Sequence, residues 1–334
     1  MISILQYYNN ELRRLSIKEL NQALHQHQGI IWVDLDDPLE AEEETILVSL
    51  FDFHPLAIED CQGGRTEDEG HPPKVEDFGD YLFIIFNPVE AVAAGENGEN
   101  AHGFEIRTSQ LSAFLTKGVL VTHHYKAMRS INFASQLVGK NPQILGRGPD
   151  YLFHMIIDDL VDNYTPILDR LDESIDRMEE EVFHRPAQET MVSILQMKRN
   201  ITTIRRVGLY QREMLNRLSR GEFPLITQDE MIYYRNVYDH LVRMTDLADS
   251  YRDTVGGLLD AYLSVTSNRL NQIMKVLTLI STIFLPLSVI TGFFGMNFAY
   301  LPGLNWEYGV LAATIFMGVV AAGMLWFFKR NKWV

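Results

Sequence analysis

Near its C-terminal end the chain carries two uncharged apolar stretches, each long enough to cross a lipid bilayer. Residues 276–294 form the first stretch and residues 308–328 form the second. A transmembrane helix needs about 20 apolar residues. Two core helices of a large soluble protein are the alternative interpretation. The short loop between the stretches and the basic, aromatic end after the second favour a membrane protein with two spans.

The basic residues beside these stretches predict how the chain is oriented. Lys329, Arg330 and Lys332 follow the second span, and Lys275 precedes the first. Basic residues that flank membrane spans tend to remain in the cytoplasm. We therefore expect an inner-membrane protein with both termini in the cytoplasm and an external loop between the spans. The first residues lack a basic stretch followed by an apolar core, so we expect no signal peptide.

The chain outside the spans is acidic, which bears on its partners. The net charge is −15; the segment from residue 276 onward has three basic and one acidic residue, so residues 1–275 carry −17. This charge disfavours nucleic acid, whose phosphates require Lys and Arg. It is compatible with cations, although an acidic surface is also typical of an ordinary soluble domain. The single cysteine, Cys61, can form neither a disulfide framework nor a cysteine-based metal site.

The first 145 residues predict an α/β domain. Short β-rich runs alternate there with turn signals and helical patches. We expect strands within residues 29–38, 81–89, 104–118 and 119–124, a helical segment at 40–51, and loops at 63–73 and 93–103.

The region that follows has the pattern of long helices. Residues 150–183 and 187–219 predict two helices joined by a sharp turn. Beyond Pro224 the next proline is Pro286, so one helix can run from residue 227 to 294. Such a helix would extend about 100 Å at about 1.5 Å per residue. This length is typical of a stalk rather than of a globular core.

One face of the first span carries small and polar side chains at heptad spacing. Alternating steps of three and four residues keep one face of a helix toward the axis of a bundle. Small residues also let membrane helices pack closely, which is the alternative explanation. Two spans cannot enclose a pore alone, so a channel would need several copies of the chain. The stripe comprises Asn271, Met274, Thr278, Ser281, Leu285, Ser288, Gly292 and Gly295.

The most specific motif lies at the end of the first span. The segment "MKVLTLISTIFLPLSVITGFFGMNF", the loop "YLPGLNWEYG" and the end "KRNKWV" together resemble the CorA family of divalent-cation channels. The triplet Gly295-Met296-Asn297 is the signature of that family. Segments similar to the family extend over nearly the whole chain, at residues 54–60, 72–86, 160–186 and 251–278.

The resemblance implies a homopentamer embedded in the lipid bilayer. Each copy would have a cytoplasmic N-terminal α/β domain, a long α-helical stalk that forms a funnel, and two transmembrane helices. The implied boundaries are 1–145 for the α/β domain, 146–275 for the funnel, 276–294 for the pore-lining span, 295–307 for the external loop, 308–328 for the second span and 329–334 for the basic cytoplasmic tail.

The resemblance also implies that Gly295, Met296 and Asn297 form a selectivity filter. Five copies of Asn297 would bind a hydrated Mg2+ through its water shell. Mg2+ prefers octahedral oxygen ligands and gives up water reluctantly. Conduction requires binding weak enough to release the ion, which suits a neutral amide oxygen. Capping of the helix end is the alternative role for Asn297.

The same resemblance assigns the pore lining to the first span. Met274 and Leu277 match an apolar constriction near the cytoplasmic end, where dewetting can gate a pore. Leu285 is a second narrow position, and Ser288 stands where the family usually has Thr. The implied pore-lining and gate residues are Asn271, Met274, Leu277, Ser281, Leu285, Ser288 and Gly292.

Relatives in this family sense intracellular Mg2+ between neighbouring cytoplasmic domains. The matching carboxylates are Asp60 and Asp260, with Glu59 beside them. Facing carboxylates repel unless a cation lies between them, and a bound cation would stabilise a closed assembly. Without the resemblance, these side chains would be interpreted as solvated surface charges. Another acidic family position is Asn236 here, which predicts weaker regulatory binding.

The loop after the first span leaves the identity of the ion open. Relatives commonly have a loop acid where this chain has Gly303, and Ala299 is also uncharged, so the loop attracts cations less strongly. We expect passive Mg2+ uptake, with Co2+ and Ni2+ as further candidates.

Two other functions compete with this one. The first is a transporter of Zn2+ or another transition metal of the ZntB type, with or without proton coupling, although that branch typically departs from Gly-Met-Asn. The second is a membrane-anchored sensor or scaffold that conducts nothing. The sequence has no glycine-rich phosphate loop and no nucleophile–base motif, so we expect no enzyme activity.

Overall fold

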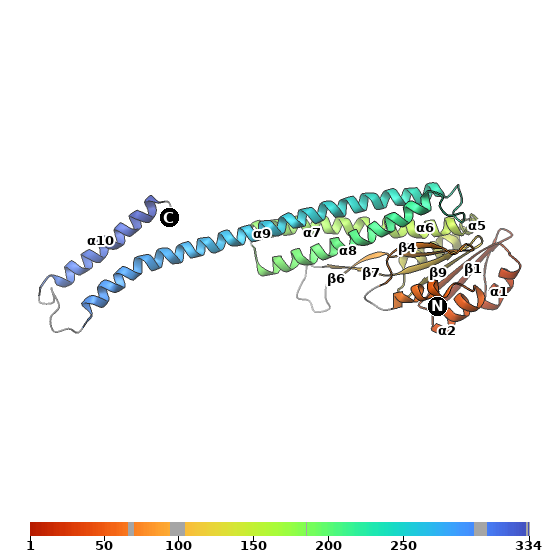
Figure 1. The fold of residues 1–334 in the computed structure, drawn as a ribbon, viewed down its shortest axis with the longest axis horizontal. Coiled ribbons are helices and arrows are strands. Elements are labelled where there is room, and N and C mark those ends of the chain that lie inside the picture. Colours follow the sequence, from red (N-terminus) through yellow and green to blue (C-terminus); the bar gives the residue numbers. More distant parts are fainter. Residues whose placement is uncertain (66–69, 94–103, 185, 297–305, 332, 334) are drawn as a thin grey trace. The chain divides into compact units, whose positions relative to one another are not determined.

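The computed structural model describes residues 1–65, 70–93, 104–184, 186–296, 306–331 and 333 (Figure 1). The chain divides into two compact units. The first unit contains residues 1–181 and 187–259, and the second contains residues 182–186 and 260–334.

A seven-stranded mixed sheet forms the centre of the first unit, in the order β2-β1-β3-β9-β8-β5-β4. Strands β3 and β9 are parallel, with Ile31 opposite Val119, and the other neighbouring strands are antiparallel. Every residue of β5, β8 and β9 is buried, which explains their nearly continuous apolar sequences. The strands are β1 (Ile2–Tyr8), β2 (Glu11–Arg14), β3 (Ile30–Asp36), β4 (Lys74–Asp77), β5 (Leu82–Phe86), β8 (Leu111–Leu115) and β9 (Val119–His124).

Short helices cover one face of this sheet, and longer helices lie on the other side (Figure 1). The short elements are α1 (Ile17–His25), α2 (Glu40–Glu43), the π-helical turn η1 (Glu44–Leu50), α3 (Pro55–Gln62) and the 3-10 turn η2 (Gly63–Arg65). The unit also contains the antiparallel pair β6 (Val89–Ala93) and β7 (Phe104–Thr108), with α4 (Arg129–Lys140), α5 (Gln143–Gly146), α6 (Pro149–Asp162), α8 (Gln188–Ser219) and α7 (Thr165–His184) up to residue 181. One core cluster joins α1, η1 and α3 to the sheet through Leu20, Ile46 and Ala57.

The longest helix, α9 (Met231–Phe294), has 64 residues. Its N-terminal part belongs to the first unit and its C-terminal part to the second. In the first unit α9 approaches α8 closely at Gly208, where a Cβ atom would lie 2.5 Å from the methyl group of Met244. The final helix, α10 (Gly309–Arg330), belongs to the second unit.

Most of the predicted elements are confirmed, but the single helix expected at residues 150–183 is wrong. The structure has two helices there, α6 and α7, because the chain breaks at Asn163 and Tyr164. The Asn163 side-chain amide donates to the Asp159 carbonyl at 2.6 Å and ends α6. Pro166, in the first turn of α7, lacks a backbone donor, so the hydrogen-bond pattern of α6 cannot continue through it.

Smaller differences occur elsewhere. The helical segment expected at residues 40–51 is a turn of α2 followed by the π-helical η1. The long helix expected from residue 227 begins at Met231. The predicted strand region 104–118 contains two strands, β7 and β8. Most of the loop predicted at 93–103 lies outside the described residues.

A buried histidine lies where α6 meets the start of α9. His154 is 6% exposed, and neither of its ring nitrogens has a hydrogen-bond partner among the described residues. Aromatic rings of Tyr151, Tyr233 and Tyr234 surround the imidazole. Burial, and then the positive charge of Arg147, lowers the pKa of His154 to about 4. The folded protein therefore keeps this ring neutral at physiological pH.

We expect His154 to make the protein less stable in acid. The folded-state pKa of about 4 is below the ordinary value of 6.5, so the unfolded chain takes up the proton first. Stability then falls as the pH drops from about 6.5 toward 4, by up to about 3 kcal/mol. In His154→Phe this loss should be absent, so thermal unfolding at pH 7 and pH 4.5 should differ less in the variant than in the wild type. An equal acid-induced loss in both proteins would contradict the assignment.

Candidate functional site

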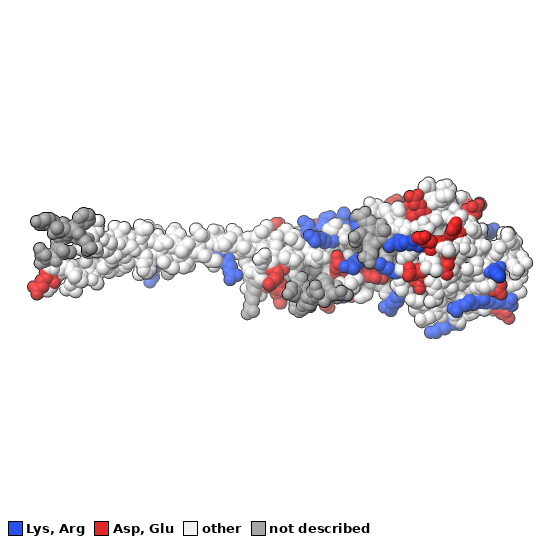
Figure 2. Space-filling model, turned by 90° about the horizontal axis from the view of Figure 1, so that it is seen from below, with Lys and Arg blue, Asp and Glu red and all other residues white. Residues whose placement is uncertain are grey.

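The two predicted spans are helical and exposed in the second unit. The most apolar 18-residue stretch of each helix has a mean hydropathy above 2, and none of either stretch is buried within the chain. Figure 2 shows Lys, Arg, Asp and Glu over the first unit, whereas the surface of the two spans seen in that view, residues 276–294 of α9 and α10, is almost uncharged. A large exposed apolar surface requires apolar surroundings, and both helices are long enough to cross a membrane.

The residues expected to line a pore all lie on exposed positions of α9. Leu279, Ile283 and Leu287 are half-buried and alternate with them along the helix. Thr278, which was expected on the same stripe, differs from the other residues. Together with Thr282 it lines a groove of about 450 Å³ between α9 and α10. The exposed residues expected in the pore are Asn271, Met274, Leu277, Ser281, Leu285, Ser288 and Gly292.

The Gly-Met-Asn motif begins where α9 ends. The Gly295 amide donates to the Thr291 carbonyl at 2.9 Å, and the Met296 amide donates to the Phe293 carbonyl at 3.4 Å. These bonds extend the hydrogen-bonded backbone of the helix by two residues beyond Phe294. Asn297, Ala299 and Gly303 lie outside the described residues, so the filter assigned to the motif stays a prediction.

Two of the expected regulatory carboxylates, Glu59 and Asp60, lie near the C-terminal end of α3. Glu59 is exposed. The Asp60 side chain is 20% exposed; its Oδ2 accepts a hydrogen bond from Lys74 Nζ at 2.5 Å, and its Oδ1 lies 3.3 Å from His71 Nε2. Asp260 is exposed on α9 and belongs to the second unit, whereas α3 belongs to the first. The pairing of Asp60 with Asp260 therefore stays a prediction.

Lys74 is the main charged partner of Asp60 in this chain. Its ammonium group also contacts Glu76 Oε1 at 2.8 Å and lies 5.6 Å from the centre of the Phe83 ring. Burial alone would lower the pKa of Lys74, but the hydrogen bonds to Asp60 and Glu76 raise it. Lys74 is therefore charged at physiological pH. Within the described part of the chain, no three or more His, Cys, Asp or Glu side chains form a group suited to a metal ion.

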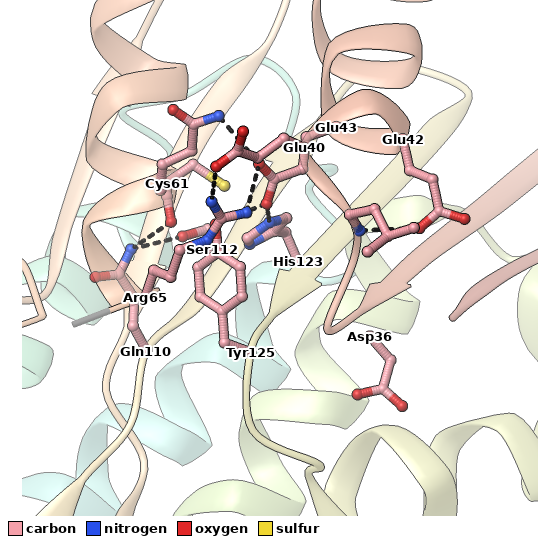
Figure 3. Close-up of polar contacts among 12 residues, drawn as sticks. Asp36, Glu40, Glu42, Glu43, Cys61, Arg65, Gln110, Ser112, His123 and Tyr125 are labelled. Carbon is pink, nitrogen blue, oxygen red and sulfur yellow. Dashed lines mark hydrogen bonds and ion pairs between the residues drawn. The ribbon is translucent and has the colours of Figure 1, made fainter. Parts of the chain in front are cut away.

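A buried polar cluster behind α3 is a feature that the sequence did not predict (Figure 3). The Glu43 side chain is fully buried, and its Oε1 lies 2.8 Å from His123 Nε2. Tyr125 donates to the same oxygen at 2.6 Å. Gln62 donates to Oε2 at 3.1 Å, and Arg65 contacts Oε2 at 3.4 Å. The cluster joins α2 and β9 to the end of α3.

The electrostatics of this cluster favour a buried ion pair. Burial alone would raise the pKa of Glu43, but the contacts with His123, Tyr125 and Gln62 lower it. Burial alone would lower the pKa of His123, but the neighbouring Cys61 and Glu43 raise it. Adjacent histidines and one cysteine were the only sequence signals, and neither predicts a partner 80 residues away.

The fold and the exposed helices define a class of protein: a membrane protein with a large α/β and helical extramembrane part before two spans. The CorA-like Mg2+ transporter protein family matches residues 27–330, and the chain belongs to that family. Proteins of this family are transporters and channels rather than enzymes, in agreement with the prediction.

Individual relatives agree with the assignment. The chain is 34% identical over 336 residues to the cobalt/magnesium transport protein CorA of Thermotoga maritima, covering 100% of this chain and 92% of that protein. The complete structure of the CorA magnesium transporter from Methanocaldococcus jannaschii has the same fold, with a TM-score of 0.79, 24% identity, and coverage of 100% and 99% of the two chains. The zinc transport protein ZntB of Yersinia enterocolitica is less similar, at 24% identity over 84% of this chain and 82% of that protein. The predicted family and fold class are thus confirmed.

Proposed function

We propose that this protein is a membrane channel or transporter for divalent metal cations and that its main cargo is Mg2+. The main support is the 34% identity to a cobalt/magnesium transport protein across the whole chain. The exposed polar and small residues on α9 agree with this role because hydroxyl and amide groups can contact the water shell of an ion. Co2+ and Ni2+ are further candidate cargoes.

In this proposal five copies of α9 surround the ion path, the number that the family resemblance implies. Several copies are needed because the two candidate spans found in the described part of one chain cannot enclose a pore. A ring of Asn297 at the external end holds hydrated Mg2+ by hydrogen bonds to its water ligands. Met274 and Leu277 form an apolar constriction that closes by excluding water. Both are more than half exposed in the single chain, so they are accessible to neighbouring copies.

Regulation by cytoplasmic Mg2+ is the second part of the proposal. Glu59 and Asp60 of one copy would face Asp260 of a neighbouring copy, and a cation between them would offset the repulsion between like charges. Binding at a subunit interface stabilises the assembly that contains the site. Low cytoplasmic Mg2+ removes that stabilisation and lets the pore open.

A Zn2+ transporter of the ZntB type is the alternative. It is supported by the similarity to the Yersinia enterocolitica protein and by the uncharged Ala299 and Gly303 in the external loop. The greater similarity to the Thermotoga maritima protein and the intact Gly-Met-Asn motif favour Mg2+.

Uptake by liposomes that contain the purified protein tests the proposal. With an inside-negative potential, we expect Mg2+ to enter faster than in protein-free liposomes, and a pH gradient to leave the rate unchanged. Co2+, Ni2+ and Zn2+ are measured in parallel. Uptake of Zn2+ that increases with a pH gradient, with little Mg2+ uptake, would favour the alternative. No flux of any of the four ions would favour a scaffold.

A further inference from the structure

The surroundings of Asp60 differ from those of a typical Mg2+ ligand. Mg2+ binds through oxygen ligands or through its own water molecules. In this chain the two carboxylate oxygens of Asp60 instead contact nitrogen atoms, Nζ of Lys74 at 2.5 Å and Nε2 of His71 at 3.3 Å. The residues around Asp60 in a single copy therefore do not fit a directly coordinated Mg2+.

Lys74 is held firmly in this position. It starts β4, which is paired to β5 with Lys74 opposite Ile85. Its ammonium group bridges Asp60 and Glu76, and its side chain is only 27% exposed. The ammonium also lies near the Phe83 ring. Partial burial reduces screening by water and makes these attractions stronger than those of a fully exposed ion pair.

The backbone at Asp60 is also fixed. The Gln110 side-chain amide donates to the Asp60 carbonyl at 2.8 Å and to Ser112 Oγ at 2.9 Å. Gln110 is 6% exposed, and its carbonyl oxygen accepts from the His71 amide at 2.9 Å. This network ties the end of α3 to β8 and to the segment before β4. The Asp60 carboxylate therefore cannot leave Lys74 by a shift of α3 alone unless these bonds break.

We propose that Lys74 is an internal counter-ion that competes with a divalent cation for Asp60. This inference rests on the proposed regulatory role of Asp60. A cation can bind there only when the Asp60–Lys74 pair opens, so the pair sets the Mg2+ concentration at which the regulatory site fills. Removal of a competing ligand tightens the binding of the other. Lys74 would thus determine the threshold at which the channel responds to cytoplasmic Mg2+.

Resistance of the detergent-purified full-length protein to protease, measured against Mg2+ concentration, tests this role without measuring transport. We expect Lys74→Met to reach half-protection at about fivefold lower Mg2+ than the wild type, the factor that corresponds to a modest ion pair. Lys74→Arg keeps the charge and should stay close to the wild type. Lys117→Met, which removes the charge of an exposed lysine in the same unit, is the matched control and should not shift the curve.

Two results separate this inference from the proposed regulation. If Asp60→Asn weakens protection by Mg2+ but Lys74→Met leaves the midpoint unchanged or raises it, the competition is wrong and the regulation stands. If Asp60→Asn leaves the midpoint unchanged, the regulatory role of Asp60 is wrong and the inference fails with it. An equal shift in Lys74→Met and Lys117→Met would indicate a general charge effect and would also overturn it. Lys74→Gln, which keeps a polar side chain, replaces Lys74→Met if the latter does not assemble.

Discussion

Mg2+ uptake by Asn297→Ala is expected to fall about tenfold or more below that of the wild type in liposomes, because the proposed ring of five Asn297 side chains would lose its amide groups. In that ring each amide oxygen would accept a hydrogen bond from the water shell of the ion, and a methyl group cannot. The proposed ring would also distinguish ions, since Mg2+ holds its water more tightly than most competitors. We therefore expect discrimination between Mg2+ and Ni2+ to weaken together with the rate.

An asparagine at the end of the other span provides a matched control. Asn331 ends α10, where its backbone and side-chain amides both donate to the Phe327 carbonyl at 3.1 Å. Asn331→Ala makes the same chemical change at a helix end, and we expect uptake close to the wild type. Undiminished Mg2+ uptake by Asn297→Ala would remove this residue from ion selection and leave helix capping as its role.

Glu43→Ala is expected to destabilise the first unit by about 3–5 kcal/mol, because it breaks a buried ion pair and leaves the partner without a counter-charge. His123 is 1% exposed, so water cannot replace the lost carboxylate as its partner. The hydroxyl of Tyr125 and the amide of Gln62 lose their acceptor as well. Thermal unfolding of the purified protein should show a clearly lower midpoint.

The neighbouring residue provides the control for this prediction. Glu44 is exposed at the start of η1, so Glu44→Ala should change the stability by less than about 0.5 kcal/mol. The variants Glu43→Ala and His123→Ala and their combination form a double-mutant cycle. If the two single losses add up exactly in the double variant, the pair contributes no coupling and the cluster has been misinterpreted.

The pH dependence of the Glu43 effect follows from the two pKa shifts. The lowered pKa of Glu43 gives stability that is present above its ordinary value of 4.5 and is lost as the pH falls. The raised pKa of His123 gives stability that is present below its ordinary value of 6.5 and is lost as the pH rises toward the folded-state pKa. Glu43→Ala should therefore cost most between about pH 4.5 and 6.5 and less in alkaline solution.

The cluster also bears on the proposed regulation. Gln62 and Arg65, which contact Glu43, follow Asp60 within five residues. A loss of the Glu43–His123 pair would thus loosen the same end of α3 that presents Asp60. Glu43→Ala is for this reason unsuitable as a specific probe of cation sensing. Lys74→Met instead leaves the Glu43 cluster in place and removes the ammonium group that Asp60 shares with Glu76.

The sequence predicted those elements whose cause is local. Strands β5 and β9 are buried throughout and therefore appear as short apolar runs that periodicity can detect. The break between α6 and α7 was missed because a helical pattern continues across it. Only the bonds of the Asn163 amide to Asp159 and of the Tyr164 hydroxyl to Asn87 and Gln211 show where the chain turns.

The candidate site divides in the same way. The Gly-Met-Asn motif is a run of consecutive residues and the stripe expected in the pore lies within one helix, so both could be predicted without the fold. The partner of Asp60 was not predicted, although Lys74 is only 14 residues away, because the loop between them gives no spacing rule. The Glu43–His123 pair was not predicted either, because no spacing rule connects residues that are 80 positions apart.

The sequence by itself determined the two spans, the long helix that enters the first of them, and the motif at its end. Span length, charge and helical periodicity are properties of consecutive residues, and a bilayer of fixed thickness selects for them directly. Tertiary structure alone decided that Lys74 neutralises Asp60 and that Glu43 meets His123. Those contacts arise because pairing of β9 with β3 and packing of α3 on the sheet bring together residues that no local rule connects.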